Sequence, residues 1–110
     1  MRKWIVGCSI GLLLTAGLLA QGKKKAAGDA AKGKDVFDQC AVCHNTDTDD
    51  VKVGPSLKGL FKHAKLANGK PVNDANVLAQ INEGGNGMPA YQDLLSDEDK
   101  ANVIAYLKTL

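Results

Sequence analysis

The pentapeptide C-A-V-C-H, Cys40 to His44, is the feature that most constrains this chain of 110 residues. Two thiols two residues apart, followed at once by a histidine, are typical of c-type haem attachment. The thiols can add to the two vinyl groups of a haem, and the adjacent imidazole is then carried beneath the iron. Cys40, Cys43 and His44 are therefore predicted to hold one haem c, with His44 as a metal ligand.

Two other chemistries use the same residue types. A redox-active C-x-x-C pair normally lies at a strand-to-helix junction of a βαβ pattern, and no such pattern is evident here. A structural zinc site needs four ligands, and beyond residue 20 the candidates are Cys40, Cys43, His44 and His63. Since Cys43 and His44 are adjacent in the sequence, a zinc site is disfavoured relative to haem.

Residues 1–20 have the character of a leader. Arg2 and Lys3 form a basic start, and residues 4–20 are apolar or small except for Ser9 and Thr15. This pattern predicts a signal peptide with cleavage after Ala20, so the protein is expected to be exported to the periplasm or another extracytoplasmic space. An uncleaved membrane anchor is the alternative, because the apolar run is close to the shortest length that spans a bilayer.

Removing the leader changes both the cysteine count and the charge. Cys8 leaves with it, so Cys40 and Cys43 are the only cysteines that remain. With both used for haem attachment, no disulfide is expected to stabilise the domain. Arg2 and Lys3 also leave, which reduces the 14 basic residues to 12, equal to the 12 acidic residues. A balanced charge argues against nucleic acid as a partner. Residues 21–29 are expected to be a polar, lysine-rich linker, and residues 30–110 a single domain.

The domain is predicted to be all-α, with about four helices. Apolar residues recur at helical spacing in residues 30–40, 56–63 and 74–83, and in a last helix that starts at Ser96. Asn73 or Asp74 is the expected N-cap of the third helix, and Ser96 with Asp99 resembles a capping box. Gly84 and Gly85 should end the third helix.

An iron held by one histidine has an open sixth position, and the domain offers two candidates to fill it. Met88 lies in a loop between Gly87 and Pro89, where a packing side chain would gain little. A methionine thioether in that position raises the reduction potential of a haem. His63, on a polar segment, is the rival ligand. The residues alone leave this choice open.

Residues 30–110 resemble the class I monohaem c-type cytochromes, in the small bacterial form. The matching pieces are G-K-D-V-F before C-A-V-C-H, then G-P-S-L-K-G-L-F, then G-M-P-A-Y, and a terminal A-Y-L-K-T-L. The resemblance implies the cytochrome c fold around one haem c, with thioethers from Cys40 and Cys43. It implies His44 and Met88 as the two iron ligands and the carbonyl of Pro55 as the partner of the His44 ring.

The resemblance also implies a crossing of the terminal helices. Gly33 and Phe37 match the first helix at this crossing, and Tyr106 and Leu107 match the last. Two features depart from the family pattern. The domain has no tryptophan to contact a haem propionate, and His63 stands where mitochondrial relatives have a propionate-facing arginine, which makes His63 only a candidate for that role.

These observations predict an electron carrier without catalytic residues, in which one iron shuttles between two oxidation states. Redox proteins are the expected partners, with Ala41, Val42, Ala90 and Tyr91 as an apolar docking rim, and the protein is expected to be a monomer. Two alternatives remain. One is a haem-bearing subunit of a dehydrogenase or oxidase complex, and the other is a five-coordinate haem enzyme or gas sensor, which would follow if Met88 is not a ligand.

Overall fold

The computed structural model describes residues 28–110, which form a helical domain. Helix α1 spans Ala30–Phe37, a 3₁₀ turn (η1) spans Leu60–Lys62, α2 spans Asp74–Glu83 and α3 spans Asp97–Leu107. Within these residues the structure has no strand, only two isolated bridges. The predicted all-α class is confirmed. The predicted leader (1–20) and most of the linker (21–29) lie outside the described residues.

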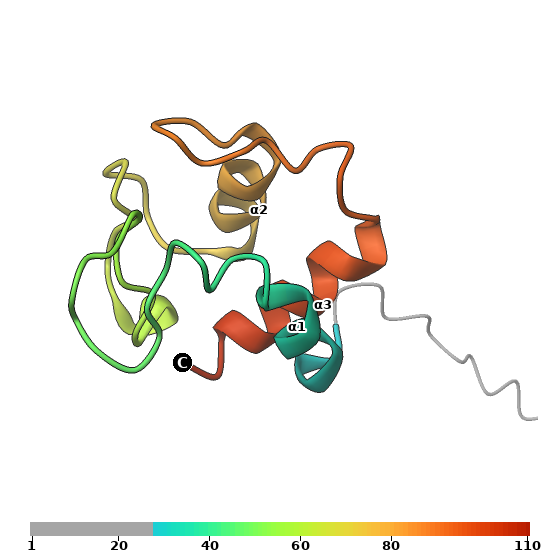
Figure 1. Cartoon of the computed structure of the whole chain (residues 1–110), viewed down its shortest axis with the longest axis horizontal. Coiled ribbons are helices and arrows are strands. Elements are labelled where there is room, and N and C mark those ends of the chain that lie inside the picture. Colours follow the sequence, from blue (N-terminus) through green and yellow to red (C-terminus); the bar gives the residue numbers. More distant parts are fainter. Residues whose placement is uncertain (1–27) are drawn as a thin grey trace, which may run out of the picture.

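The helices are arranged around the crossing of α1 and α3. Figure 1 shows these two helices crossing, with α2 above them and the long 38–72 connection on the opposite side from the start of α1. The rings of Phe37 and Tyr106 lie 5.3 Å apart at 49°. A Cβ on Gly33 would overlap the backbone carbonyl of Asn102 and lie 2.9 Å from Tyr106 Cβ. The predicted crossing is therefore present, and it depends on a residue without a side chain.

Short polar side chains define where the helices begin. Asp29 caps α1, Asn73 caps α2 through the amide of Asn76 at 2.8 Å, and Ser96 caps α3 through the amide of Asp99 at 3.0 Å. Each cap satisfies an amide that has no partner inside its helix. The predicted bounds of the third helix, and the start of the last one, are confirmed.

Two predicted helices are shorter than expected. The first ends at Phe37 rather than Cys40, because bonds from the Cys40 and Cys43 amides to carbonyls three residues back tighten residues 38–43 into turns. The helix expected over 56–63 is only the 3₁₀ turn η1, since Gly59 has a left-handed φ of 61° and interrupts it. Both changes shape the walls of the functional site.

The core is small and contains two polar residues. Eight hydrophobic side chains are buried, and they come from α1, η1, α2, α3 and the loop at Tyr91. Lys100 and Asn102, on α3, are buried as well, which the helical pattern did not predict. Lys100 Nζ donates to the Gln92 carbonyl at 2.9 Å, and Asn102 Oδ1 accepts from the Asp29 amide at 2.7 Å. Both buried polar groups are thus paired, as burial requires.

Candidate functional site

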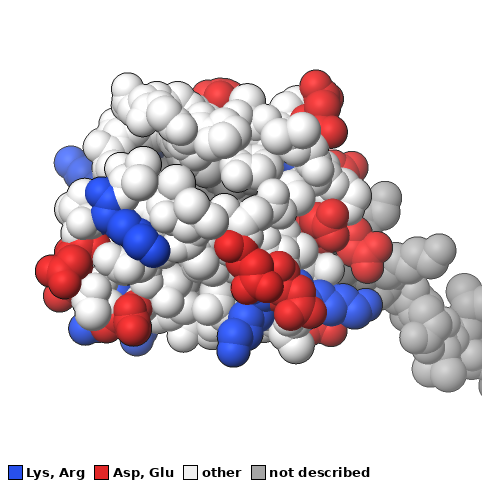
Figure 2. Space-filling model, viewed as in Figure 1, with Lys and Arg blue, Asp and Glu red and all other residues white. Residues whose placement is uncertain are grey.

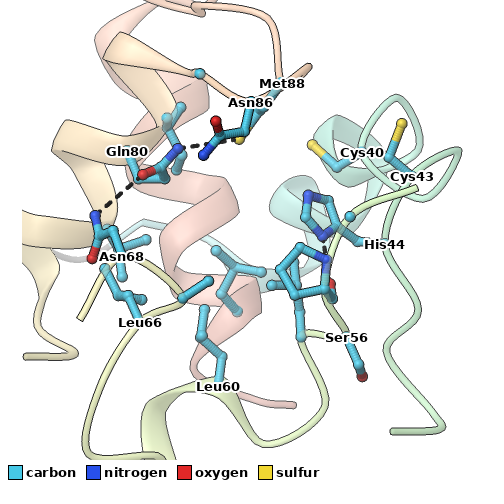
Figure 3. A pocket seen from close by; sticks show the side chains of 18 of the residues that line it. Cys40, Cys43, His44, Ser56, Leu60, Leu66, Asn68, Gln80, Asn86 and Met88 are labelled. Carbon is cyan, nitrogen blue, oxygen red and sulfur yellow. Dashed lines mark hydrogen bonds between the residues drawn. The ribbon is translucent and has the colours of Figure 1, made fainter. Parts of the chain in front are cut away.

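The turns that follow α1 bring Cys40, Cys43 and His44 to one wall of a cavity. The amides of Ala41 and His44 bond to the carbonyls of Phe37 and Cys40, so the pentapeptide coils back on itself. Figure 3 shows the two sulfurs and the imidazole on the same side of the space. Both thiols are free and half-buried. Burial raises the pKa of the Cys40 thiol, and the neighbouring Cys43 raises it further.

The His44 ring is held in place by Gly54 and Pro55, which lie against it in the folded chain. Its Nδ1 lies 2.7 Å from the carbonyl oxygen of Pro55. Because a carbonyl can only accept, Nδ1 carries the proton and Nε2 keeps a free lone pair. Gly54 packs directly under the ring, where a Cβ would lie 2.5 Å from His44 Cε1. The imidazole is therefore oriented as a metal ligand would need to be.

Met88 lies at another wall of the same space, on a tight turn. The Gly85 and Met88 amides bond to each other's carbonyls at 2.9 and 3.0 Å. The two central residues, Asn86 and Gly87, have φ angles of 53° and 92°, as a type I′ turn requires. Figure 3 shows Met88 and Gln80 facing His44 across the cavity. The turn holds the Met88 backbone in one position.

The cavity has a volume of about 580 Å³. Apolar side chains from η1, α2, α3 and two loops line it: Leu57, Leu60, Leu66, Val77, Ile81 and Leu107. This size lies within the usual range for a cofactor pocket, about 300–1,000 Å³. The space, two thiols on one wall and an oriented imidazole together fit a covalently held haem.

His63 and Lys65 lie at the rim of the cavity, away from the cysteines in the sequence and on the loop after η1. Both residues line the cavity, and both are exposed. His63 Nε2 bonds to the backbone carbonyl of Lys58 at 2.9 Å. Lys65 is the only lysine or arginine among the described lining residues, and no aspartate or glutamate lines the cavity there.

The predicted apolar rim needs one correction. Tyr91 is buried, at 9% exposure, so it is part of the core rather than the rim. Its amide donates to the carbonyl of Ile81 at 2.9 Å, which ties this loop to α2, and Tyr91 lines the cavity. Val42, a member of the predicted rim, is highly exposed at 67%, and so are Val51 and Val53, which were not predicted, at 73% and 76%.

The comparisons with known proteins agree on one family. Residues 28–107 match the family described as cytochrome C oxidase, cbb3-type, subunit III. Cytochrome c6 of Synechocystis sp. is 36% identical over 98 residues, which cover 87% of this chain and 78% of that protein. Cytochrome c2 of Blastochloris viridis is 41% identical over 78 residues, covering 69% of this chain and 56% of that protein.

The chain belongs to the class I monohaem c-type cytochromes. The crystal structure of cytochrome c6 from the diatom Phaeodactylum tricornutum has a TM-score of 0.56 and 32% identity, and the match covers 74% of this chain and 93% of that one. The family and the cytochrome c fold, both predicted from the sequence, are confirmed. The cytochrome carries one covalently bound haem c and transfers electrons without acting as an enzyme.

Sequence reasoning missed three residues of the site. Gln80 and Asn68 line the cavity of the cytochrome, and Gly54 supports the His44 ring. Gln80 is three residues after Val77 and so shares the apolar face of α2, which was a signal in the helical pattern. Asn68 and Gly54 lie in loops, where only the folded chain shows what they contact. No helix among residues 28–110 is both long and apolar enough to cross a membrane.

Proposed function

We propose that this cytochrome is an exported single-electron carrier, with haem attached through Cys40 and Cys43 and iron ligated by His44 and Met88. The observation that carries the proposal is the pairing of an oriented imidazole with a thioether across one apolar cavity. The bond from His44 Nδ1 to Pro55 leaves Nε2 free for iron, and Met88 is held by its own turn. The two thiols lie on the same wall as the imidazole.

The residues of this chain would keep the iron's surroundings unchanged between oxidation states. Bound haem supplies one-electron chemistry between ferrous and ferric iron. The hydrogen bond to Pro55 fixes the His44 ring and increases its basicity. Pro89 restricts the backbone of Met88, so little conformational freedom is lost when the sulfur binds. The apolar walls exclude water, and the soft thioether raises the potential.

His63 is the weaker candidate for the distal position. Its Nε2 is engaged by the Lys58 carbonyl at 2.9 Å, and the ring is exposed at the rim of the cavity. An imidazole there would have to give up this bond and enter the interior. His63 and Lys65 are better placed to face the haem propionates. No acidic residue among the described lining residues would repel the negative charge of the propionates.

The docking surface for redox partners is proposed at the exposed valines beside Cys43. Val42 directly precedes Cys43. Val51 and Val53 lie on the loop that returns to Cys43, where the Gly54 amide donates to the Cys43 carbonyl at 2.7 Å. Such a small apolar rim suits brief contacts with a donor and an acceptor. On the face of the molecule seen in Figure 2, the charged side chains lie mainly along the margins and in the lower half.

Export follows from residues 1–20, which lie outside the described residues. The basic start at Arg2 and Lys3 and the apolar run to Ala20 support cleavage there, leaving the linker and one domain. Mass spectrometry of the protein recovered from an extracytoplasmic fraction tests this. A mature N-terminus at Gln21 is expected, and an intact N-terminus in the membrane fraction would favour the anchor instead.

The Met88→Ala variant tests the ligand assignment. The ferric native protein should show the weak far-red absorption band of a sulfur-to-iron bond, and its ferrous form should resist carbon monoxide. In the variant the band should disappear, the potential should fall and carbon monoxide should bind. The matched control is His63→Ala, which should keep the band and remain closed to carbon monoxide.

The opposite pattern would reassign the site. If the native protein lacks the band and Met88→Ala changes neither potential nor ligand binding, Met88 is a loop residue. The iron is then five-coordinate, or His63 is its ligand, and the protein becomes a candidate haem enzyme or sensor.

A second candidate function is a haem-bearing subunit of an oxidase complex. The family match, described as a subunit of a cbb3-type oxidase, favours it. Both functions use the same iron site, so spectra cannot separate them. Purification of the native protein in mild detergent does: a free carrier elutes at the mass of one chain, whereas a subunit elutes with a large redox enzyme.

A further inference from the structure

Two Asn-Gly pairs occur in the chain, Asn68-Gly69 and Asn86-Gly87, and all of their residues are exposed. Asparagine is one of the thermolabile residues of proteins, because the backbone nitrogen that follows it can attack its side-chain carbonyl carbon. A following glycine leaves this approach open, since it has no side chain to obstruct it. Every other asparagine of the chain is followed by a residue with a side chain, so these two pairs are the ones to compare.

Hydrogen bonds hold both reacting groups of the Asn68-Gly69 pair. The Asn68 carboxamide donates from Nδ2 to Gln80 Oε1 at 3.3 Å and accepts at Oδ1 from the Lys70 amide at 3.0 Å. The attacking nitrogen, that of Gly69, donates to the Leu66 carbonyl at 2.9 Å. Attack requires the Gly69 amide to lose its proton and the carboxamide to turn toward it, so each of these bonds opposes the reaction.

The Asn86-Gly87 pair lacks this protection. Within residues 28–110, neither the Asn86 carboxamide nor the Gly87 amide makes a hydrogen bond, because the bonds of this turn join Gly85 and Met88 instead. Figure 3 shows Asn86 beside Met88 at the cavity. The same dipeptide is therefore held by hydrogen bonds at one edge of the cavity and free to react at the other.

We propose that Asn86-Gly87 is a site of spontaneous deamidation whose isoaspartate product releases Met88 from the iron. The release rests on the proposed role of Met88 as the distal ligand. In the first step the Gly87 nitrogen forms a bond to Asn86 Cγ, the bond from Cγ to the side-chain nitrogen breaks, and that NH₂ group leaves as ammonia with the proton of the Gly87 amide. Water then opens the cyclic imide at one of its two carbonyl carbons. Opening at the side-chain carbonyl gives aspartate, and opening at the main-chain carbonyl gives isoaspartate.

Isoaspartate changes the turn that carries Met88. The main chain of isoaspartate runs through the former side chain, so one additional carbon atom separates residues 86 and 87. The paired bonds between Gly85 and Met88, at 2.9 and 3.0 Å, need two residues of normal length between them. The turn should therefore open, and the sulfur should leave the iron.

Incubation of the haem-loaded protein in warm, mildly alkaline buffer, followed by peptide mass spectrometry, tests the site. The peptide that contains Asn86 should exchange NH₂ for OH, and labelling by an isoaspartyl methyltransferase should locate isoaspartate there. Asn68 is the matched control. In the folded protein it should convert about tenfold more slowly than Asn86, because its hydrogen bonds must first break, whereas in denaturant the two rates should be similar.

Two results would overturn the site itself. One is an equal rate at Asn68 and Asn86 in the folded protein. The other is an Asn86 that stays intact in the folded protein over the time in which the unfolded chain converts completely.

The release is tested on the isoaspartate form after chromatographic separation. It should lose the far-red sulfur-to-iron band and bind carbon monoxide when ferrous. Freshly purified Asn86→Asp adds the negative charge without the additional carbon atom, so it should keep the band. A band that persists in the isoaspartate form, or disappears in Asn86→Asp, rejects release by the lengthened turn. A native protein that lacks the band rejects the assignment of Met88 as ligand, and the release with it, whereas the masses still report whether Asn86 is modified.

Discussion

Gly54 decides how closely the chain can approach the imidazole of His44. An added methyl group would lie 2.5 Å from Cε1 and 2.9 Å from Nδ1 of the ring, well inside van der Waals contact. The next residue, Pro55, holds Nδ1 at 2.7 Å. The ring cannot move away from a side chain at position 54 without weakening this bond.

The Gly54→Ala variant should therefore change the proposed proximal ligand. A displaced His44 loses its partner at Pro55, becomes a poorer electron donor and stabilises ferric iron less, so the potential should rise. The overpacking should also lower stability, by about 1–3 kcal/mol. Voltammetry and thermal melting of the haem-loaded protein measure the two effects. Val51→Ala, at an exposed residue of the same loop that does not line the cavity, is the control and should change neither.

Two results would contradict this account of Gly54. An unchanged potential would mean that His44 keeps its bond to Pro55 when the methyl group is present. A lower potential would mean that the ring donates more strongly, and the Pro55 carbonyl would then not be what sets its basicity.

The site residues differ in how far the sequence could reveal them. Cys40, Cys43 and His44 were predicted because all three lie within five consecutive residues whose spacing is typical of haem attachment. Gln80 and Gly54 were not, since their contacts depend on α2 and the 52–57 loop reaching the same cavity. Tyr91 was placed on the rim, but a residue's neighbours in sequence do not show which way its side chain turns. The burial of Tyr91 is visible only in the folded chain, where the loop is bonded to Ile81 of α2.

At the level of elements, the domain depends on the crossing of α1 and α3. Gly33 would raise the free energy of an isolated helix by about 1 kcal/mol relative to alanine. In the folded chain the comparison reverses, because any Cβ there overlaps the Asn102 carbonyl. The neighbouring contact between Phe37 and Tyr106, at 5.3 Å, requires the same close approach.

The Gly33→Ala variant should therefore destabilise the protein despite its better helix propensity. The expected loss is about 1–3 kcal/mol, which corresponds to a fall of several degrees in melting temperature for a domain of this size. Differential scanning calorimetry of the haem-loaded protein measures it. Lys34→Ala, on the exposed side of α1, is the control and should change stability little. A melting temperature that rises in Gly33→Ala would show that the crossing does not limit the distance between the helices.

The helix boundaries show which signals are local. The bounds of α2 were predicted because a side-chain cap at Asn73 and a glycine at Gly84 define them within the segment. The end of α1 was predicted too late, since residues 38–40 are tightened by the turns that shape the haem motif. The 56–63 segment has helical spacing, but the left-handed backbone of Gly59 interrupts it, and spacing carries no information on φ.

At the scale of the whole molecule, the core is organised around a cavity. Only eight hydrophobic side chains are buried, and no large side chain is fully buried among the described residues. Apolar side chains line the cavity of about 580 Å³, and exposed His63 and Lys65 lie at its rim. A large apolar occupant would remove these lining side chains from water, so filling the cavity should stabilise the fold.

Covalent attachment should consequently decide whether the fold persists. In the double variant Cys40→Ala with Cys43→Ala, haem should be extractable by acid–acetone, and the protein should melt at a lower temperature or be degraded in the cell. The reason is that thioether bonds keep the occupant in the cavity while the surrounding helices fluctuate. Cys8→Ala, which removes the third cysteine of the chain, is the control and should retain haem through extraction. If haem stays bound through extraction in the double variant, other residues must attach it, and the assignment of the pentapeptide as the attachment site is wrong.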